Sequence, residues 1–111
     1  MQNTYKTILH LPESVQPTYE PKEYGVNAYR SGNYFSAIES LVKARTTDYQ
    51  DWESRLYLAM AYGRAGLVLE SLREFMQIVQ ECPDAKLRKK AIIAKEALSK
   101  EIKSSWVSMI T

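Results

Sequence analysis

The chain is poor in the side chains that build catalytic and metal sites. It contains one cysteine, Cys82, and one histidine, His10, far apart in the sequence. A lone cysteine excludes an internal disulfide, and a zinc site would need about four such ligands. Neither a glycine-rich nucleotide loop nor a phosphate-binding lysine motif is present. We therefore expect no catalytic residues, no metal and no cofactor, and we expect that the protein is not an enzyme.

Proline, glycine, net charge and long apolar runs are scarce too. Four prolines and four glycines favour helices over a sheet fold with many turns. A formal net charge of +2 gives little long-range attraction for nucleic acid. No run reaches the roughly 18 apolar residues that cross a bilayer, and the first residues do not resemble a secretory signal. The composition predicts one cytoplasmic, all-α domain.

The sequence contains one unit that occurs twice, with a period of about 34 residues. Small residues align with small ones, and large apolar residues align with large apolar ones. The aligned pairs include Arg30 and Arg64, Gly32 and Gly66, Ala37 and Ser71, and Leu41 and Phe75. Helical spacing inside each copy makes this the signature of a helical repeat protein.

The apolar spacing predicts five helices, over about 21–31, 34–45, 50–65, 68–82 and 85–104. Gly32 and Gly66 are expected to end the first and third helices, and either Asp48 or Asp51 to cap the third. The third helix is apolar around much of its circumference, which predicts neighbours on two sides. The inner stripe predicted for the fourth helix consists of Leu69, Leu72, Phe75, Met76 and Val79.

The two ends of the chain differ from the repeats. Residues 1–17 are interrupted by Pro12 and Pro17 and are predicted to form an irregular arm. Residues 105–111 are predicted to form an apolar tail that either folds back or docks on a partner. The helix over 85–104 has one apolar face and is expected to cap the stack. Its other face is strongly basic, with Lys86, Arg88, Lys89, Lys90, Lys95, Lys100 and Lys103 against Glu96 and Glu101.

Each 34-residue unit resembles a tetratricopeptide repeat, a pair of antiparallel helices. The resemblance covers two copies, 18–51 and 52–85, with helix 85–104 as the cap of an 18–104 domain. It implies a short right-handed superhelix of two helix pairs plus a capping helix, with an irregular N-terminal arm. The small residues that match the family pattern are Gly25, Ala37, Ala44, Ala59 and Ser71, and the bulky ones are Tyr24, Leu41, Leu58, Tyr62 and Phe75. Arg55 departs from it, because that position is usually aromatic.

In that family the first helix of each pair lines a concave groove that holds a partner. The resemblance places nine residues of this chain there: Lys22, Val26, Tyr29, Arg30, Glu53, Leu56, Met60, Arg64 and Lys90. Val26, Leu56 and Met60 would form an apolar floor. The alternative for Tyr29, Leu56 and Met60 is that they only pack the helices together. The resemblance implies a non-catalytic adaptor or scaffold that binds a peptide or helix of another protein.

Two further hypotheses remain open at this point. Two full repeats are few for an independent stack, so the arm and the tail could complete it in a self-assembling, homo-oligomeric structural or assembly-factor subunit. Alternatively, the basic helix over 86–103 could contact an anionic membrane surface. Nucleic acid is not an expected partner, because that helix has no aromatic residues among its basic ones.

Overall fold

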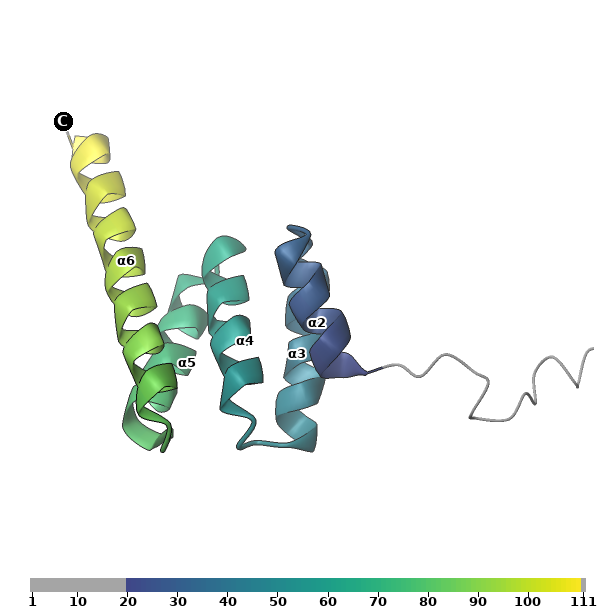
Figure 1. Ribbon diagram of the computed structural model, residues 1–111. Coiled ribbons are helices and arrows are strands. Elements are labelled where there is room, and N and C mark those ends of the chain that lie inside the picture. Colours follow the sequence, from purple (N-terminus) through teal and green to yellow (C-terminus); the bar gives the residue numbers. More distant parts are fainter. Residues whose placement is uncertain (1–19, 111) are drawn as a thin grey trace, which may run out of the picture.

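The computed structural model describes residues 20–110, and within that range it contains five helices and no strand (Figure 1). The all-α fold class is therefore confirmed. The predicted arm, 1–17, lies outside the described residues. The helices are α2 (Pro21–Arg30), α3 (Tyr34–Thr47), α4 (Trp52–Arg64), α5 (Val68–Glu81) and α6 (Ala85–Ile110).

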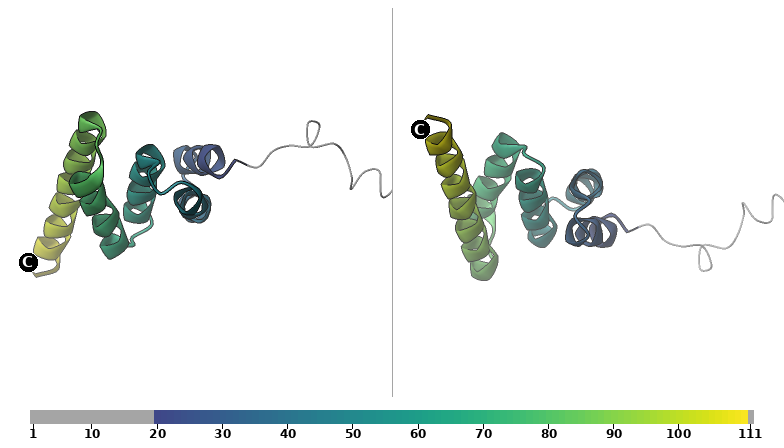
Figure 2. Two further views of the ribbon diagram at one scale, coloured as in Figure 1. Left: turned by 90° about the horizontal axis from the view of Figure 1, so that it is seen from below. Right: turned by 90° about the horizontal axis from the view of Figure 1, so that it is seen from above.

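The helices form two antiparallel hairpins followed by a single long helix. Helices α2 and α3 pair first, α4 and α5 pair next, and α6 packs against the second hairpin (Figure 1). Helix α4 also contacts both α2 and α6. Figure 2 looks nearly along α3, whereas α2 and α6 are seen inclined to it. Helices α2, α4 and α6 thus share one face of the molecule.

The two hairpins are closed by the same turn. Gly32 and Gly66 both have φ +85°, a left-handed conformation that suits glycine because it has no Cβ. In each turn the residue after the glycine donates its backbone N–H to the carbonyl five residues earlier, one that has no partner within the helix. These bonds are Asn33 N–H to Ala28 O at 2.8 Å and Leu67 N–H to Tyr62 O at 2.9 Å.

The buried faces of α3 and α5 also match position for position along the repeat. In α3 the buried residues are Ala37, Ser40, Leu41 and Ala44. In α5 they are Ser71, Glu74, Phe75 and Ile78. Each of these α5 residues occupies the position aligned with one in α3, so the duplication read from the sequence extends to the packing.

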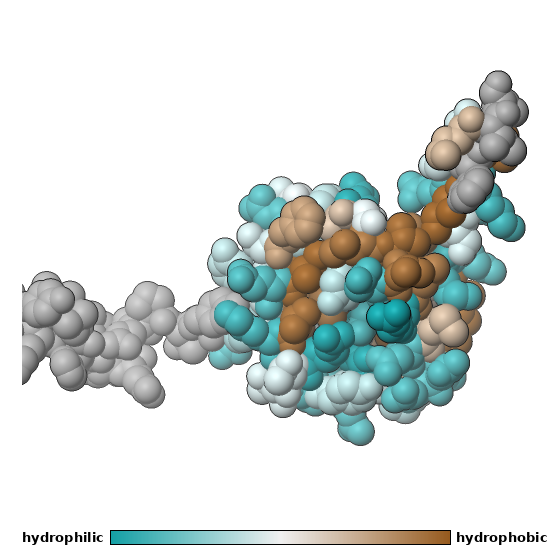
Figure 3. Space-filling view, turned by 180° about the vertical axis from the view of Figure 1, so that it is seen from behind, coloured by the Kyte–Doolittle hydropathy of each residue, from teal (hydrophilic) through white to brown (hydrophobic). Residues whose placement is uncertain are grey.

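The prediction that Leu69 and Met76 lie on the inner stripe of α5 is wrong. Their side chains are 69% and 48% exposed. The buried face is turned toward Ser71, whose hydroxyl donates to the backbone carbonyl of Ala59 at 2.7 Å and draws α5 close to α4. Seen from behind, apolar side chains gather in a band that crosses this side of the molecule and continues along α6 (Figure 3).

Helix α4 lies between two clusters of buried residues. Leu58 and Ala61 belong to the cluster shared with α2 and α3. Leu56 and Ala59 belong to the cluster shared with α5 and α6. The prediction that this helix has neighbours on two sides is therefore confirmed. Asp51, rather than Asp48, is its N-cap, accepting a hydrogen bond from the Ser54 backbone N–H at 3.2 Å.

Two predicted helix ends are wrong. Helix α3 continues to Thr47, and the hydroxyls of Thr46 and Thr47 donate to backbone carbonyls one turn earlier. Helix α6 continues to Ile110 rather than ending near Ser104, so most of the predicted tail is helical. No glycine or proline lies between 104 and 110 to stop it. Among the helices of 20–110, none is long and apolar enough to span a membrane.

Candidate functional site

The face formed by α2, α4 and α6 carries three neighbouring hollows, of about 440, 340 and 590 Å³. The first two share Glu53 and Tyr57, and the last two share Met60, Ala94 and Ala97. The structure therefore brings together all nine residues predicted to bind a partner. The first hollow contains Lys22, Val26, Arg30 and Glu53; the second contains Glu53, Leu56, Met60 and Lys90; the third contains Tyr29, Met60 and Arg64.

Between α2 and α4 this face is held by polar and aromatic contacts. The Lys22 ammonium lies 3.2 Å from the carboxylate of Asp51 and 3.0 Å from that of Glu53. Arg30 donates to the Tyr57 hydroxyl at 3.2 Å. The ring of Tyr57 also meets that of Tyr29, with centroids 5.7 Å apart. These residues contact one another across the two helices, so the hollow of about 440 Å³ on this part of the face is bordered by charged side chains that are already paired within the protein.

The titration of the Lys22 and Asp51 groups reflects the same contacts. Partial burial lowers the pKa of Lys22, but its hydrogen bonds to Glu53 and Asp51 outweigh burial, and the pKa lies above its ordinary value. Burial raises the pKa of Asp51, but hydrogen bonds from Ser54 and Lys22 prevail and hold it below its ordinary value. Both groups are therefore charged at neutral pH and attract each other across α2 and α4.

Between α4 and α6 the face is open, apolar and free of such ties. We call this the α4–α6 groove. Within residues 20–110, these two helices meet through packing contacts rather than through hydrogen bonds or ion pairs. Gly63, Ala94 and Ala97 are small, so the groove stays hollow between them. Its lining consists mainly of Leu56, Tyr57, Met60, Gly63 and Arg64 of α4 and Leu87, Lys90, Ile93, Ala94, Ala97, Leu98 and Glu101 of α6, together with Glu53 of α4, Tyr29 of α2, and Ser71 and Phe75 of α5.

Several residues of the groove were missed by the prediction from sequence, and one predicted residue was misjudged. Tyr57, Ile93 and Ala97 line it but were not among the predicted nine. Ile93 and Ala97 lie three and seven residues after Lys90, so the helical face that carries Lys90 could have identified them. Leu56 borders the hollow but is only 5% exposed and packs in the core. For Leu56 the packing alternative is therefore the better description.

Arg55 belongs to a buried ionic network. Its side chain is fully buried, and its Nε lies 3.2 Å from a carboxylate oxygen of Glu74. The guanidinium lies over the rings of Tyr49 and Trp52, at 4.2 and 4.8 Å from their centroids. Arg45 pairs with the same Glu74. The two neighbouring rings, together with these polar partners, allow the charge of Arg55 to be buried.

The other reactive side chains do not assemble into a site within the described range. Cys82 is buried in the core beside Phe75 and Ala91. No group of three or more potential metal-ligating side chains occurs between residues 20 and 110. His10 lies outside the described residues.

Comparison with known proteins gives no further guide to this face. No protein-family model, no curated protein and no solved structure matches the chain. The geometry of the α4–α6 groove and the repeat in the sequence therefore carry the functional argument.

Proposed function

We propose that this chain is a cytoplasmic, non-catalytic module of the tetratricopeptide type that binds a segment of a partner protein in the α4–α6 groove. The proposal rests on the difference between two parts of one face, the part between α2 and α4 and the part between α4 and α6. Side chains bridge α2 and α4, whereas an apolar hollow stays open between α4 and α6. The repeat assignment is supported by the matched turns and the matched buried faces of the two hairpins.

The groove has the composition of a peptide-binding surface. Its floor and walls are apolar, and charged side chains lie at its ends, with Glu53 and Lys90 at one and Arg64 and Glu101 at the other. Apolar anchors of a partner would bury surface in the middle, and polar contacts at the ends would fix the register. Tyr57 and Arg64 are residue types that often dominate binding energy.

A homo-oligomer is the second candidate, favoured by exposed apolar side chains away from the groove. Leu69, Met76, Val107 and Met109 are between 48% and 78% exposed. A second copy of the chain could cover them. Light scattering of the full chain over a range of concentrations distinguishes the candidates, because a monomer throughout rules out this self-association.

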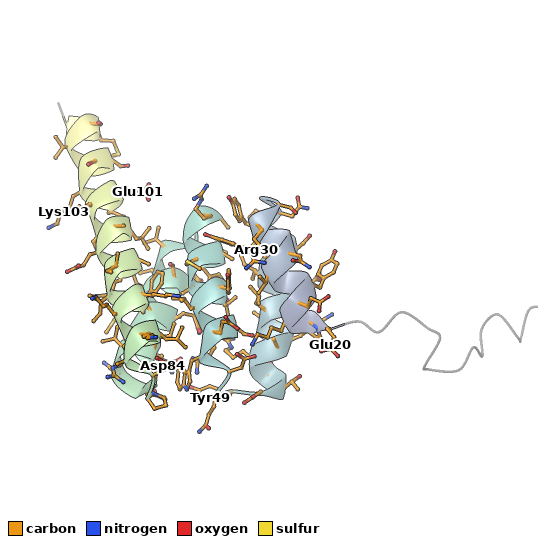
Figure 4. The ribbon with its side chains drawn as sticks, in the orientation of Figure 1. Glu20, Arg30, Tyr49, Asp84, Glu101 and Lys103 are labelled. Carbon is orange, nitrogen blue, oxygen red and sulfur yellow. The ribbon has the colours of Figure 1, made fainter. Side chains whose placement is uncertain are left out.

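The groove assignment is tested by selecting peptides from a display library with the full chain as bait. Ala97 is exposed and lines the groove, so Ala97→Trp should fill the hollow without disturbing the core. Lys103→Trp is the matched control on the same helix, because Figure 4 shows Lys103 directed away from the side of α6 that carries Glu101.

The wild type and Lys103→Trp should enrich the same peptides, and Ala97→Trp should enrich none of them. Circular dichroism and thermal unfolding verify that each variant is folded. Enrichment of the same peptides by a folded Ala97→Trp variant would remove the groove from the proposal. No enrichment by the wild type would contradict the proposed function itself.

A further inference from the structure

We propose that the segment bound in the α4–α6 groove is an amphipathic helix whose flank over the start of α6 carries acidic side chains. The inference rests on the proposed function and adds the secondary structure and charge of the partner. It follows from the backbone of the groove walls, from the size of the residues between them, and from the charges along each wall.

The walls favour a helix over an extended segment. Both walls are α-helices, whose interior backbone N–H and C=O groups are already bonded within the helix. An extended segment would find no main-chain partners there, whereas a helix brings its own backbone bonds already satisfied. The groove follows α4 from Glu53 to Arg64, which is about 16 Å of helix. Three turns of a partner helix fit this length, with apolar anchors against Met60, Ala94 and Ala97.

The α4 wall offers little free charge to a partner. Glu53 pairs with Lys22 at 3.0 Å, although it shares that ammonium with Asp51, so its charge is partly compensated within the protein. At the other end of the wall, the Arg64 guanidinium lies over the ring of Tyr34, 5.3 Å from its centroid. Both ends of this wall are thus engaged with α2 or α3, and we expect α4 to contribute mainly apolar contact.

The α6 wall, by contrast, carries positive charge that the described chain does not compensate. Lys86 and Lys90 are exposed and lie one turn apart, so they share one face of the helix. The first turn of α6 contains no acidic residue. Four ion pairs occur in the described part of the chain, and none involves a lysine of α6. Basic groups at a helix start also oppose the helix dipole, so acidic partners there would be favourable.

Glu101 limits how far the acidic flank extends. It lines the far end of the groove, and Figure 4 shows it on the side of α6 that faces α4. An acidic residue of the partner would be repelled there. The acidic residues should therefore lie over Lys86 and Lys90, with a neutral or basic residue near Glu101, which fixes the register of the bound helix.

Three synthetic helices with one shared apolar stripe test the inference. Their flank carries glutamate, glutamine or lysine, and their affinity for the full chain is measured by fluorescence anisotropy at low and high salt. The glutamate peptide should bind about tenfold more tightly than the lysine peptide at low salt, and the difference should shrink at high salt. In the Lys86→Glu/Lys90→Glu variant this order should reverse, whereas Lys100→Glu/Lys103→Glu, farther along α6, should keep it.

Each other outcome is decisive. Equal binding of the three peptides through a groove that Ala97→Trp blocks would overturn the charge inference and leave the proposed function standing. Selection of extended or basic peptides from the display library would likewise overturn this inference and leave the proposed function standing. Anionic vesicles of phosphatidylserine and phosphatidylcholine are the remaining probe. If they bind the chain through Lys86 and Lys90 and the glutamate peptide does not compete, the positive wall serves a membrane surface and the inference is wrong.

Discussion

Asp51 performs two tasks at the start of α4. Its carboxylate accepts hydrogen bonds from the backbone N–H and the hydroxyl of Ser54, at 3.2 and 2.8 Å, and pairs with Lys22 of α2. It therefore caps one helix and ties it to another. These bonds hold the pKa of Asp51 below its ordinary value, so the stability they contribute depends on the charged form.

We predict that Asp51→Ala lowers the free energy of unfolding by about 1 kcal/mol at pH 7. Because the folded pKa is lower than the unfolded one, this contribution is complete above about pH 4 and is lost as the pH falls further. The wild type and the variant should therefore approach equal stability near pH 2. Urea unfolding at both pH values measures this, and an equal difference at pH 7 and pH 2 would contradict it.

At the scale of the helices, Gly25 decides how closely α2 approaches α3. It is buried, and a Cβ added there would lie 2.6 Å from Cγ of Leu41 and 3.3 Å from the Leu41 backbone nitrogen. The neighbour is a fully buried side chain held against the backbone, so the clash cannot be relieved without separating the two helices.

We predict that Gly25→Ala lowers the free energy of unfolding by about 1–3 kcal/mol. The helix propensity of alanine is roughly 1 kcal/mol more favourable than that of glycine, so a net loss of stability would have to come from the clash. Asn27→Ala is the matched control, because Asn27 is exposed on the same helix and gains propensity without a clash. A Gly25→Ala variant as stable as this control would show that α2 and α3 have room to separate.

The elements that local chemistry specifies were predictable from the sequence. Gly32 and Gly66 end their helices at the predicted positions because a left-handed turn needs glycine. The exposure of Leu69 and Met76 was not predictable, because it depends on how α5 is rotated against α4. The end of α6 was also missed, since an apolar tail with no breaker continues a helix as readily as it leaves one.

At the scale of the whole molecule, the candidate site follows from a difference between two helix interfaces. Across α2 and α4 ion pairs, a hydrogen bond and the contact between the rings of Tyr29 and Tyr57 bridge the two helices, whereas the small residues Gly63, Ala94 and Ala97 border the hollow between α4 and α6. The repeat predicted that nine residues share one face, and the structure has them on one face. It did not reveal which of the two interfaces is bridged by polar side chains, because that depends on side chains that meet across helices distant in sequence.

The methionines provide the most direct test of the groove. Met60 lines it, whereas Met76 and Met109 are exposed outside its lining. NMR of the full chain with methyl-labelled methionine therefore gives separate signals from inside and outside the groove. The chain is titrated with the tightest peptide from the display selection. We predict that the Met60 signal shifts while those of Met76 and Met109 stay in place. A shift of Met76 or Met109 with an unchanged Met60 would contradict the α4–α6 groove as the binding site.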